Sequence, residues 1–189
     1  GISKEEIRTA FLRHATSKIR RANDLFNIHT LGFRGEALSS ISSIAKCEII
    51  SKPSSQLTGV RYVIEGGVEV SFEDVGAPVG TTLLIRDIFF NTPVRRKFLK
   101  SASTETAYIS ELVEKFMLSN LDVSIRYIVN NQTKLQSSGN GDLKEVIYQI
   151  YGREVHKALI EVDYSADDIS IKGFIAKPEI SRANKSQLI

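Results

Sequence analysis

The chain has 189 residues, of which 42% are hydrophobic and 25% are charged. This composition is typical of a soluble globular protein of one or two domains. The formal net charge of +3 permits contact with nucleic acid without requiring it. A single cysteine, Cys47, excludes an internal disulfide, and no leader or membrane-length apolar run is visible, so we expect a reducing cytoplasm and no membrane partner.

The first third of the chain alternates helices and polar loops. A helix is expected over residues 3–19, with Ser3 as its N-cap and Glu6 at the capping-box position. Residues 20–34 are polar and show no sustained period, which is typical of a functional loop. A second helix is expected over residues 35–45, where apolar residues recur at helical spacing.

Strands are expected next. Residues 46–52 form one strand, in which Cys47 is a small buried hydrophobe. Gly66-Gly67 lies between two β-rich runs and predicts a hairpin of residues 60–64 and 68–72. Residues 81–87 are largely apolar, as in the strand of a covered sheet.

The remaining elements follow in the same way. Pro93 suits the first turn of a short helix through Leu99, with Phe98 and Leu99 anchoring it inward. An amphipathic helix over residues 103–119 has an apolar stripe that is assigned to the core and consists of Ile109, Leu112, Val113, Phe116 and Met117. The later expectations are a strand over 123–129 turned back by Asn130-Asn131, a linker at 137–141, a helix capped by Asp142 and ended by Gly152, and strands near 159–164 and 168–176.

The stretch Gly32-Phe33-Arg34-Gly35-Glu36-Ala37-Leu38 carries the strongest functional signal. It is a glycine-containing loop that opens into a helix, where unpaired backbone N–H groups and the helix dipole favour an anion. The pattern predicts a phosphate cradle for a nucleotide, although such loops often serve packing alone. It is not a Walker A loop, because no Gly-Lys-Ser/Thr occurs.

Three further stretches accompany this one: His14-Ala15-Thr16-Ser17-Lys18-Ile19, Gly80-Thr81-Thr82, and Asn91-Thr92-Pro93-Val94-Arg95-Arg96-Lys97-Phe98-Leu99. Together the four resemble the N-terminal ATPase region of the MutL mismatch-repair family, within the superfamily of gyrase, Hsp90 and histidine kinases. The resemblance implies an α/β (α+β) fold, a two-layer α/β sandwich ATPase domain that is incomplete at its N-terminus. Residues 1–138 would be the remainder of that domain, and residues 139–189 the truncated start of a ribosomal-protein-S5-like second domain.

The resemblance also implies roles for individual residues. ATP phosphates would be held by Thr16, Ser17, Lys18, Gly32, Phe33, Arg34, Gly35, Glu36 and Ala37, and adenine by Thr81 through an aspartate and water. Simpler interpretations stand beside these. Lys18 would otherwise be a solvated residue at a helix end, Glu36 a first-turn acid stabilised by the dipole, and Thr81 an ordinary strand residue. His14 is assigned no chemistry, and no residue set has metal-ligand spacing.

Both ends of the sequence look cut by comparison with the family. Gly1-Ile2 would be the end of a DNGxGI stretch, so the family's catalytic glutamate and magnesium-binding asparagine would lie outside this chain. The intact parent would be an ATPase that uses ATP and Mg, with DNA, a MutS-type protein and a MutL-type dimer partner as its partners, in the bacterial cytoplasm or a eukaryotic nucleus. DNA contact would be weak and independent of sequence, with Arg95, Arg96 and Lys97 as its first candidates. The alternatives are another ATPase of the superfamily and a non-hydrolysing scaffold for DNA binding or protein docking.

Overall fold

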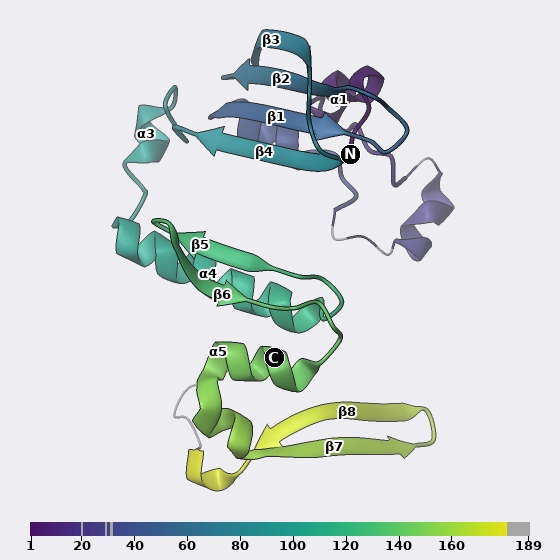
Figure 1. Cartoon of the computed structure of the whole chain (residues 1–189), viewed down its shortest axis with the longest axis vertical. Coiled ribbons are helices and arrows are strands. Elements are labelled where there is room, and N and C mark those ends of the chain that lie inside the picture. The colour runs from purple at the N-terminus through teal and green to yellow at the C-terminus, as the bar shows by residue number, and fades with distance from the viewer. Residues whose placement is uncertain (20, 29, 31, 181–189) are drawn as a thin grey trace. The chain divides into compact units, whose positions relative to one another are not determined.

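The structure, a computed structural model, describes residues 1–19, 21–28, 30 and 32–180. The chain forms two compact units, which divide between Leu99 and Lys100 and are called unit 1 and unit 2 below. Both mix helices with antiparallel strands, which confirms the expected α/β fold class (Figure 1). The domain boundary near residue 138 and the S5-like fold of the second domain stay predictions.

Unit 1 is built on a four-stranded antiparallel sheet of order β3-β2-β1-β4 (Figure 1). The predicted strand and hairpin are confirmed, with the turn at Gly66-Gly67. Since side chains alternate between the faces of a strand, Cys47, Ile49 and Ser51 point to one buried face. The strands are β1 (Lys46–Lys52), β2 (Gly59–Glu65), β3 (Val68–Val75) and β4 (Gly80–Arg86).

Two helices, α1 (Lys4–Ala10) and α2 (Ala37–Ser42), cover that face of the sheet. The core joins α1 and the end of the α2 segment to the sheet, and its Cys47 is buried, which raises the pKa of the thiol. The buried members are Ile7, Phe11, Ala45, Cys47, Ile49, Val60, Tyr62 and Ile64.

Both helices are shorter than predicted. Ser3 is the N-cap of α1, as expected, but its hydroxyl bonds to the Glu6 carboxylate at 3.2 Å and caps no backbone N–H. α1 ends at Ala10 rather than near residue 19, and the segment that follows contains a left-handed residue, His14, whose φ is +62°. α2 begins only after Gly35, which has the same left-handed φ of +62°.

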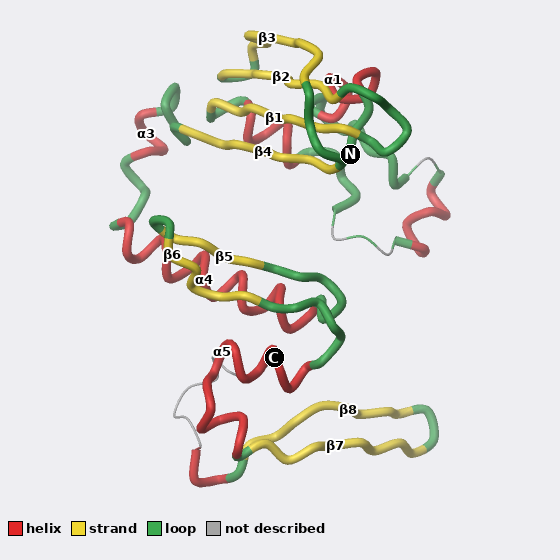
Figure 2. Tube along the Cα trace, viewed as in Figure 1, coloured by secondary structure: helices red, strands yellow, loops and turns green. Residues whose placement is uncertain are grey.

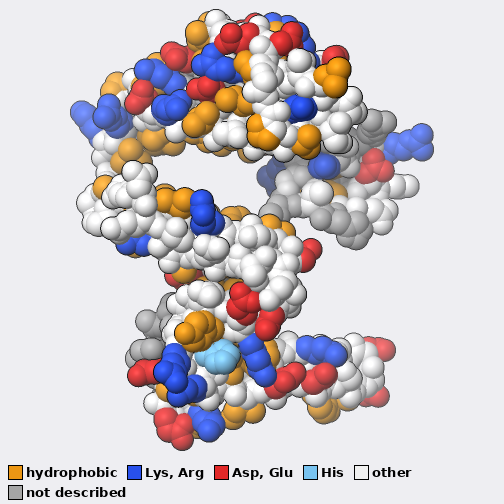
Figure 3. Space-filling view, in the orientation of Figure 1, with side chains coloured by type: hydrophobic (Ala, Val, Ile, Leu, Met, Phe, Trp, Pro, Cys, Tyr) orange, Lys and Arg blue, Asp and Glu red, His pale blue; other side chains and the backbone are white. Residues whose placement is uncertain are grey.

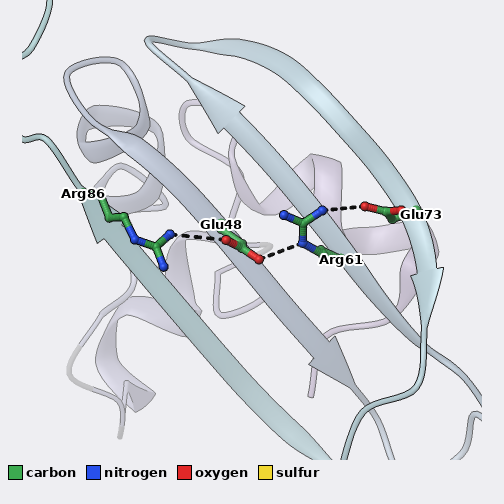
Figure 4. Close-up of polar contacts among 4 residues, drawn as sticks. All are labelled: Glu48, Arg61, Glu73 and Arg86. Carbon is green, nitrogen blue, oxygen red and sulfur yellow. Dashed lines mark hydrogen bonds and ion pairs between the residues drawn. The ribbon is translucent and has the colours of Figure 1, made fainter.

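A row of alternating charges crosses the other face of the sheet (Figure 4). The Glu48 carboxylate accepts from Arg61 Nε at 2.7 Å and from an Arg86 nitrogen at 3.3 Å, and Arg61 also pairs with Glu73 at 2.5 Å. The hydrogen bond from Arg61 lowers the pKa of Glu48. Such pairing is part of a surface on which Lys/Arg and Asp/Glu side chains are interspersed (Figure 3).

The prediction that the β4 run is covered was wrong. Leu83 and Ile85 lie opposite Ile49 and Cys47 in the register, on the helix side of the sheet, yet they are 39% and 43% exposed. β4 is an edge strand, and the core cluster of the described residues does not extend over it.

The segments that leave the sheet also differ in part from expectation. The polar stretch 20–34 contains a short 3₁₀ helix, η1 (Ala22–Asn27); residues 20, 29 and 31 of that stretch lie outside the described residues. Pro93 opens α3 (Pro93–Arg96), as predicted. Phe98 and Leu99 do not anchor it inward, however, because they are 77% and 42% exposed.

Unit 2 contains two longer helices, and each is followed in the chain by a β-hairpin (Figure 2). The predicted Asn130-Asn131 turn is confirmed, with φ of +48° and +62°, and the Asp142 carboxylate caps its helix by accepting from the backbone N–H of Lys144 at 2.8 Å. The predicted end of the first helical stretch at Gly152 is confirmed, because its φ of +82° and ψ of −179° are not helical; a second helical stretch follows this kink within α5. The elements are α4 (Ala102–Ser119), β5 (Arg126–Val129), β6 (Gln132–Gln136), α5 (Leu143–Lys157), β7 (Leu159–Ala166), β8 (Ile169–Ala176) and η2 (Pro178–Ile180).

The apolar stripe of α4 is only partly core. Met117 is fully buried, whereas Ile109, Leu112 and Phe116 are exposed in the structure. The helix itself was predicted correctly, because its period is set by local sequence. The core assignment of these three residues was wrong, because burial depends on what packs against the stripe.

Candidate functional site

Unit 1 contains a cleft of about 1050 Å³ beside α1 and α2. Its walls are the end of α1, the segment that follows it, and the loop that leads into α2. The lining residues are Gly1, Ile2, Glu6, Thr9, Ala10, residues 14–18 and residues 32–38. All the predicted site residues except Thr81 therefore line one cleft, although the two stretches that carry them are separated by more than a dozen positions in the sequence.

Gly35 joins the two walls. Its φ is +62°, and a Cβ built there would lie 2.2 Å from the carbonyl oxygen of Ala15. Only glycine combines that backbone conformation with so close an approach. A Cβ at Gly32 would meet nothing within 4 Å, so Gly35 serves packing, whereas Gly32 leaves open space on the cleft wall.

A contact between His14 and Glu36 lies at the same junction. Nδ1 of His14 lies 3.1 Å from Oε1 of Glu36, and both residues line the cleft. His14 is one of the few non-glycine residues with a positive φ, a conformation in which histidine is enriched. Glu36 is the N-cap residue of α2, one position outside the helix where its first turn was expected. The contact ties the segment that follows α1 to the residue before α2.

The cleft offers cations and donors to an anion. Lys18 and Arg34 are exposed and line it, and neither is in an ion pair among the described residues. Thr16 organises the approach to Lys18, since its hydroxyl accepts from the Lys18 backbone N–H at 3.1 Å. The Arg34 guanidinium lies 5.6 Å from the centre of the Phe33 ring, within the range of a cation–π contact.

Thr81 lies outside the lining but is connected to it through Ser51. The Thr81 hydroxyl lies 2.8 Å from the Ser51 hydroxyl, which accepts from the backbone N–H of Ile2 at 2.7 Å. Ile2 lines the cleft. Ser51 is 1% exposed and was not singled out from the sequence. The available signal was a serine at an inward-facing strand position, because a buried hydroxyl requires partners.

Other chemistry is sparse in the described part of the chain. No group of three or more His, Cys, Asp or Glu side chains in it is arranged to hold a metal ion. A smaller cavity of about 360 Å³ in unit 2 is lined mainly by apolar side chains of α5 and β8. Among the described residues, no helix is both long and apolar enough to cross a membrane.

Relatives match almost the whole chain. A DNA mismatch repair protein MutL of Agathobacter rectalis is 54% identical over 186 residues, which cover 98% of this chain and 29% of that protein. The chain is part of a MutL-type protein. The MutL of Caldanaerobacter subterraneus is 43% identical over 186 residues, covering 98% of this chain and 32% of the relative. The chain thus spans about a third of the length of the curated MutL proteins that it matches.

Structure and family comparisons agree. The Aquifex aeolicus MutL ATPase domain, solved in complex with ADP, superposes with a TM-score of 0.68 at 30% identity, covering 84% of this chain and 60% of that one. The family described as DNA mismatch repair protein, C-terminal domain, matches residues 147–189. The resemblance to the MutL family is therefore confirmed, and the roles of the individual cleft residues stay predictions.

Proposed function

We propose that the protein binds ATP in the cleft of unit 1 and uses it as a switch in DNA mismatch repair. The observation that carries the proposal is the convergence of residues 14–18 and 32–38 on one cleft with two cations, Lys18 and Arg34, that have no ion-pair partner among the described residues. The volume of about 1050 Å³ suits a nucleotide-sized ligand. The similarity to an ATPase domain solved with ADP supports the same ligand class.

In this proposal the phosphates lie against Lys18, Arg34 and the loop 32–36, and the base end lies toward Ile2, Ser51 and Thr81. Lys18 supplies a compact ammonium charge, while Arg34 supplies a fork of donors. The hydroxyls of Thr16 and Ser17 and the backbone of the loop add hydrogen bonds. His14 lies 3.1 Å from the Glu36 carboxylate and so links the two segments that line the phosphate side of the cleft.

Magnesium and the water-activating base are proposed to depend on residues outside this sequence. The role proposed for the described residues of the cleft is to bind and orient phosphate groups. A bound magnesium would gather phosphate charge. The contribution of this chain is the pre-formed wall that holds the polyphosphate.

The partners are proposed from the same family. They are a MutL-type dimer partner, a MutS-type mismatch-recognition protein and the DNA backbone, in the cytoplasm of a bacterium. Arg95, Arg96 and Lys97 are exposed and are the first DNA candidates. Replacing all three by glutamine should flatten the salt dependence of DNA affinity by about 0.9 for each DNA phosphate that the protein no longer neutralises; an unchanged slope would place the DNA surface elsewhere.

The nucleotide proposal is tested by titrating the full-length protein with a fluorescent ATP analogue. Lys18→Ala should raise the dissociation constant by about 10- to 100-fold, because a charge-assisted hydrogen bond contributes roughly 1.5–3 kcal/mol. Lys134→Ala is the matched control, since it removes the same charge from an exposed hairpin in unit 2. Equal constants for wild type and Lys18→Ala would return Lys18 to a solvated surface residue. Absence of any binding by the wild type would favour the scaffold alternative.

A further inference from the structure

The last residue of α2, Ser42, and the three residues that follow it accept hydrogen bonds from distant segments. The carbonyl of Ser42 accepts from the backbone N–H of Gly67 at 2.9 Å, and that of Ala45 accepts from Gly66 at 3.2 Å. The carbonyls between them are satisfied from the loop after β4: the Ile44 carbonyl accepts from Phe89 N–H at 2.7 Å and the Ser43 carbonyl from Asn91 Nδ2 at 2.9 Å. The four donors, Gly66, Gly67, Phe89 and Asn91, are called the α2 anchor.

The loop that supplies half of the α2 anchor is strained. Asp87 and Phe89 both have left-handed backbone, with φ of +50° and +63°, which is a genuine outlier for a residue as bulky as phenylalanine. Such strain persists only where the surroundings over-determine it, and it concentrates at functional positions. Here Lys46 pairs with Asp87 at 2.9 Å and lies 5.6 Å from the Phe90 ring. The strain lets Phe89 N–H reach the end of α2.

α2 connects this anchor to the cleft over a short distance. The helix has six residues, which corresponds to a length of about 9 Å. A helix of this length is not stable by itself, so its position is set by tertiary contacts at its ends and along its apolar face. At its other end lie the cleft residues Gly35, Glu36, Ala37 and Leu38. A shift of the C-terminal end of α2 therefore also shifts the residues at its N-terminal end, which line the cleft.

We propose that Asn91 is a positioning residue for the nucleotide cleft: through the α2 anchor it fixes the helix whose opposite end forms the phosphate-side wall. The ligand in this inference rests on the proposed function, whereas the link from Asn91 through α2 to residues 32–38 does not. Asn91 does not line the cleft. Its effect on the cleft is indirect: the Asn91 amide donates to the Ser43 carbonyl, and Ser43 directly follows α2.

The test is Asn91→Asp in the full-length protein, which keeps the shape of the side chain but replaces the amide donor by an acceptor facing the Ser43 carbonyl. The matched control is Asn120→Asp. Asn120 Nδ2 likewise donates at 2.9 Å to a helix carbonyl, that of Phe116 in α4, in the other unit. Affinity for a fluorescent ATP analogue is measured well below the unfolding midpoint, together with amide exchange of residues 32–38 in the absence of nucleotide.

We expect Asn91→Asp to weaken nucleotide binding by roughly three- to tenfold, the equivalent of one missing hydrogen bond, and to speed amide exchange in residues 32–38. Asn120→Asp should change neither, even if it lowers the unfolding temperature. Similar affinity and exchange for the two variants would overturn the proposal. If Asn91→Asp does not fold, Asn91→Ser, whose hydroxyl is too short to reach the carbonyl, takes its place under the same criteria. A wild type that binds no nucleotide defeats the proposed function alone, because the exchange readout still tests the link.

Discussion

The two ends of α2 are built on opposite principles. At the C-terminal end the carbonyls of Ser42, Ser43, Ile44 and Ala45 all accept hydrogen bonds from the α2 anchor. At the other end the cleft presents Lys18 and Arg34, which have no ion-pair partner among the described residues. Carbonyls that already accept hydrogen bonds need no further partner, so that end of α2 is stable without a ligand. Cations without partners are stabilised when an anion binds. The comparison identifies one end as the fixed support and the other as the binding surface.

The largest effect is expected from a substitution at Gly35, where the loop before α2 packs against residues 14–18. Gly35→Ala should cost roughly 2–5 kcal/mol of stability in unit 1, about 1–2 for the left-handed backbone and about 1–3 for overpacking against Ala15. Nucleotide binding should be lost with it, because the loop can no longer close on residues 14–18. The measurements are chemical denaturation and nucleotide titration of the full-length protein.

Gly141→Ala is the control for that substitution. Gly141 has a φ of +80°, but a Cβ there would meet nothing within 4 Å. It should therefore lose only the backbone term of about 1–2 kcal/mol and keep its nucleotide affinity. Equal losses for both variants would show that Gly35 supplies conformational freedom alone and does not lock the walls together.

A smaller effect is expected from the charge row on the far face of the sheet, where every charge has a partner. Glu48→Gln should lower stability by less than about 1 kcal/mol, as for other partly exposed pairs, and leave nucleotide affinity unchanged. Because its pKa is held below the usual 4.5 in the folded state, Glu48 contributes stability at neutral pH that is lost as acid protonates it.

Thermal unfolding at pH 7 and at acidic pH checks this sign. The variant should lose less stability than the wild type as the pH falls below about 4.5, because the titrating group has been removed. A variant that is more sensitive to acid than the wild type, or one with altered nucleotide affinity, would contradict the assignment of this row to the support rather than to the site.

Elements set by local sequence were predictable, and features set by long-range contacts were not. The Gly66-Gly67 and Asn130-Asn131 turns, the Asp142 cap and the strand periods are all in the structure as expected, since each depends on neighbouring residues. The early end of α1 was missed, and so was the contact of His14 with Glu36, which lies 22 positions later. No local pattern shows that contact.

The candidate site divides in the same way. The site residues named from the family motifs, Thr81 excepted, line one cleft, but the motifs did not show that Gly35 packs on Ala15 or that Ser51 links Thr81 to Ile2. Likewise, Asn91 was visible as part of a motif, while its bond to the Ser43 carbonyl joins residues 48 positions apart. Exposure of Phe98 and Leu99 was also missed, because apolar character alone does not say what covers a side chain.

The most direct test of the central claim is amide hydrogen exchange of the full-length protein with and without ATP. If the cleft holds the phosphates, ATP should slow exchange in residues 14–18 and 32–38 and leave the strands β2 and β3 unchanged, because these strands lie outside the cleft lining. Bound ATP without added protection in either cleft segment would contradict the account and place the nucleotide elsewhere on the protein.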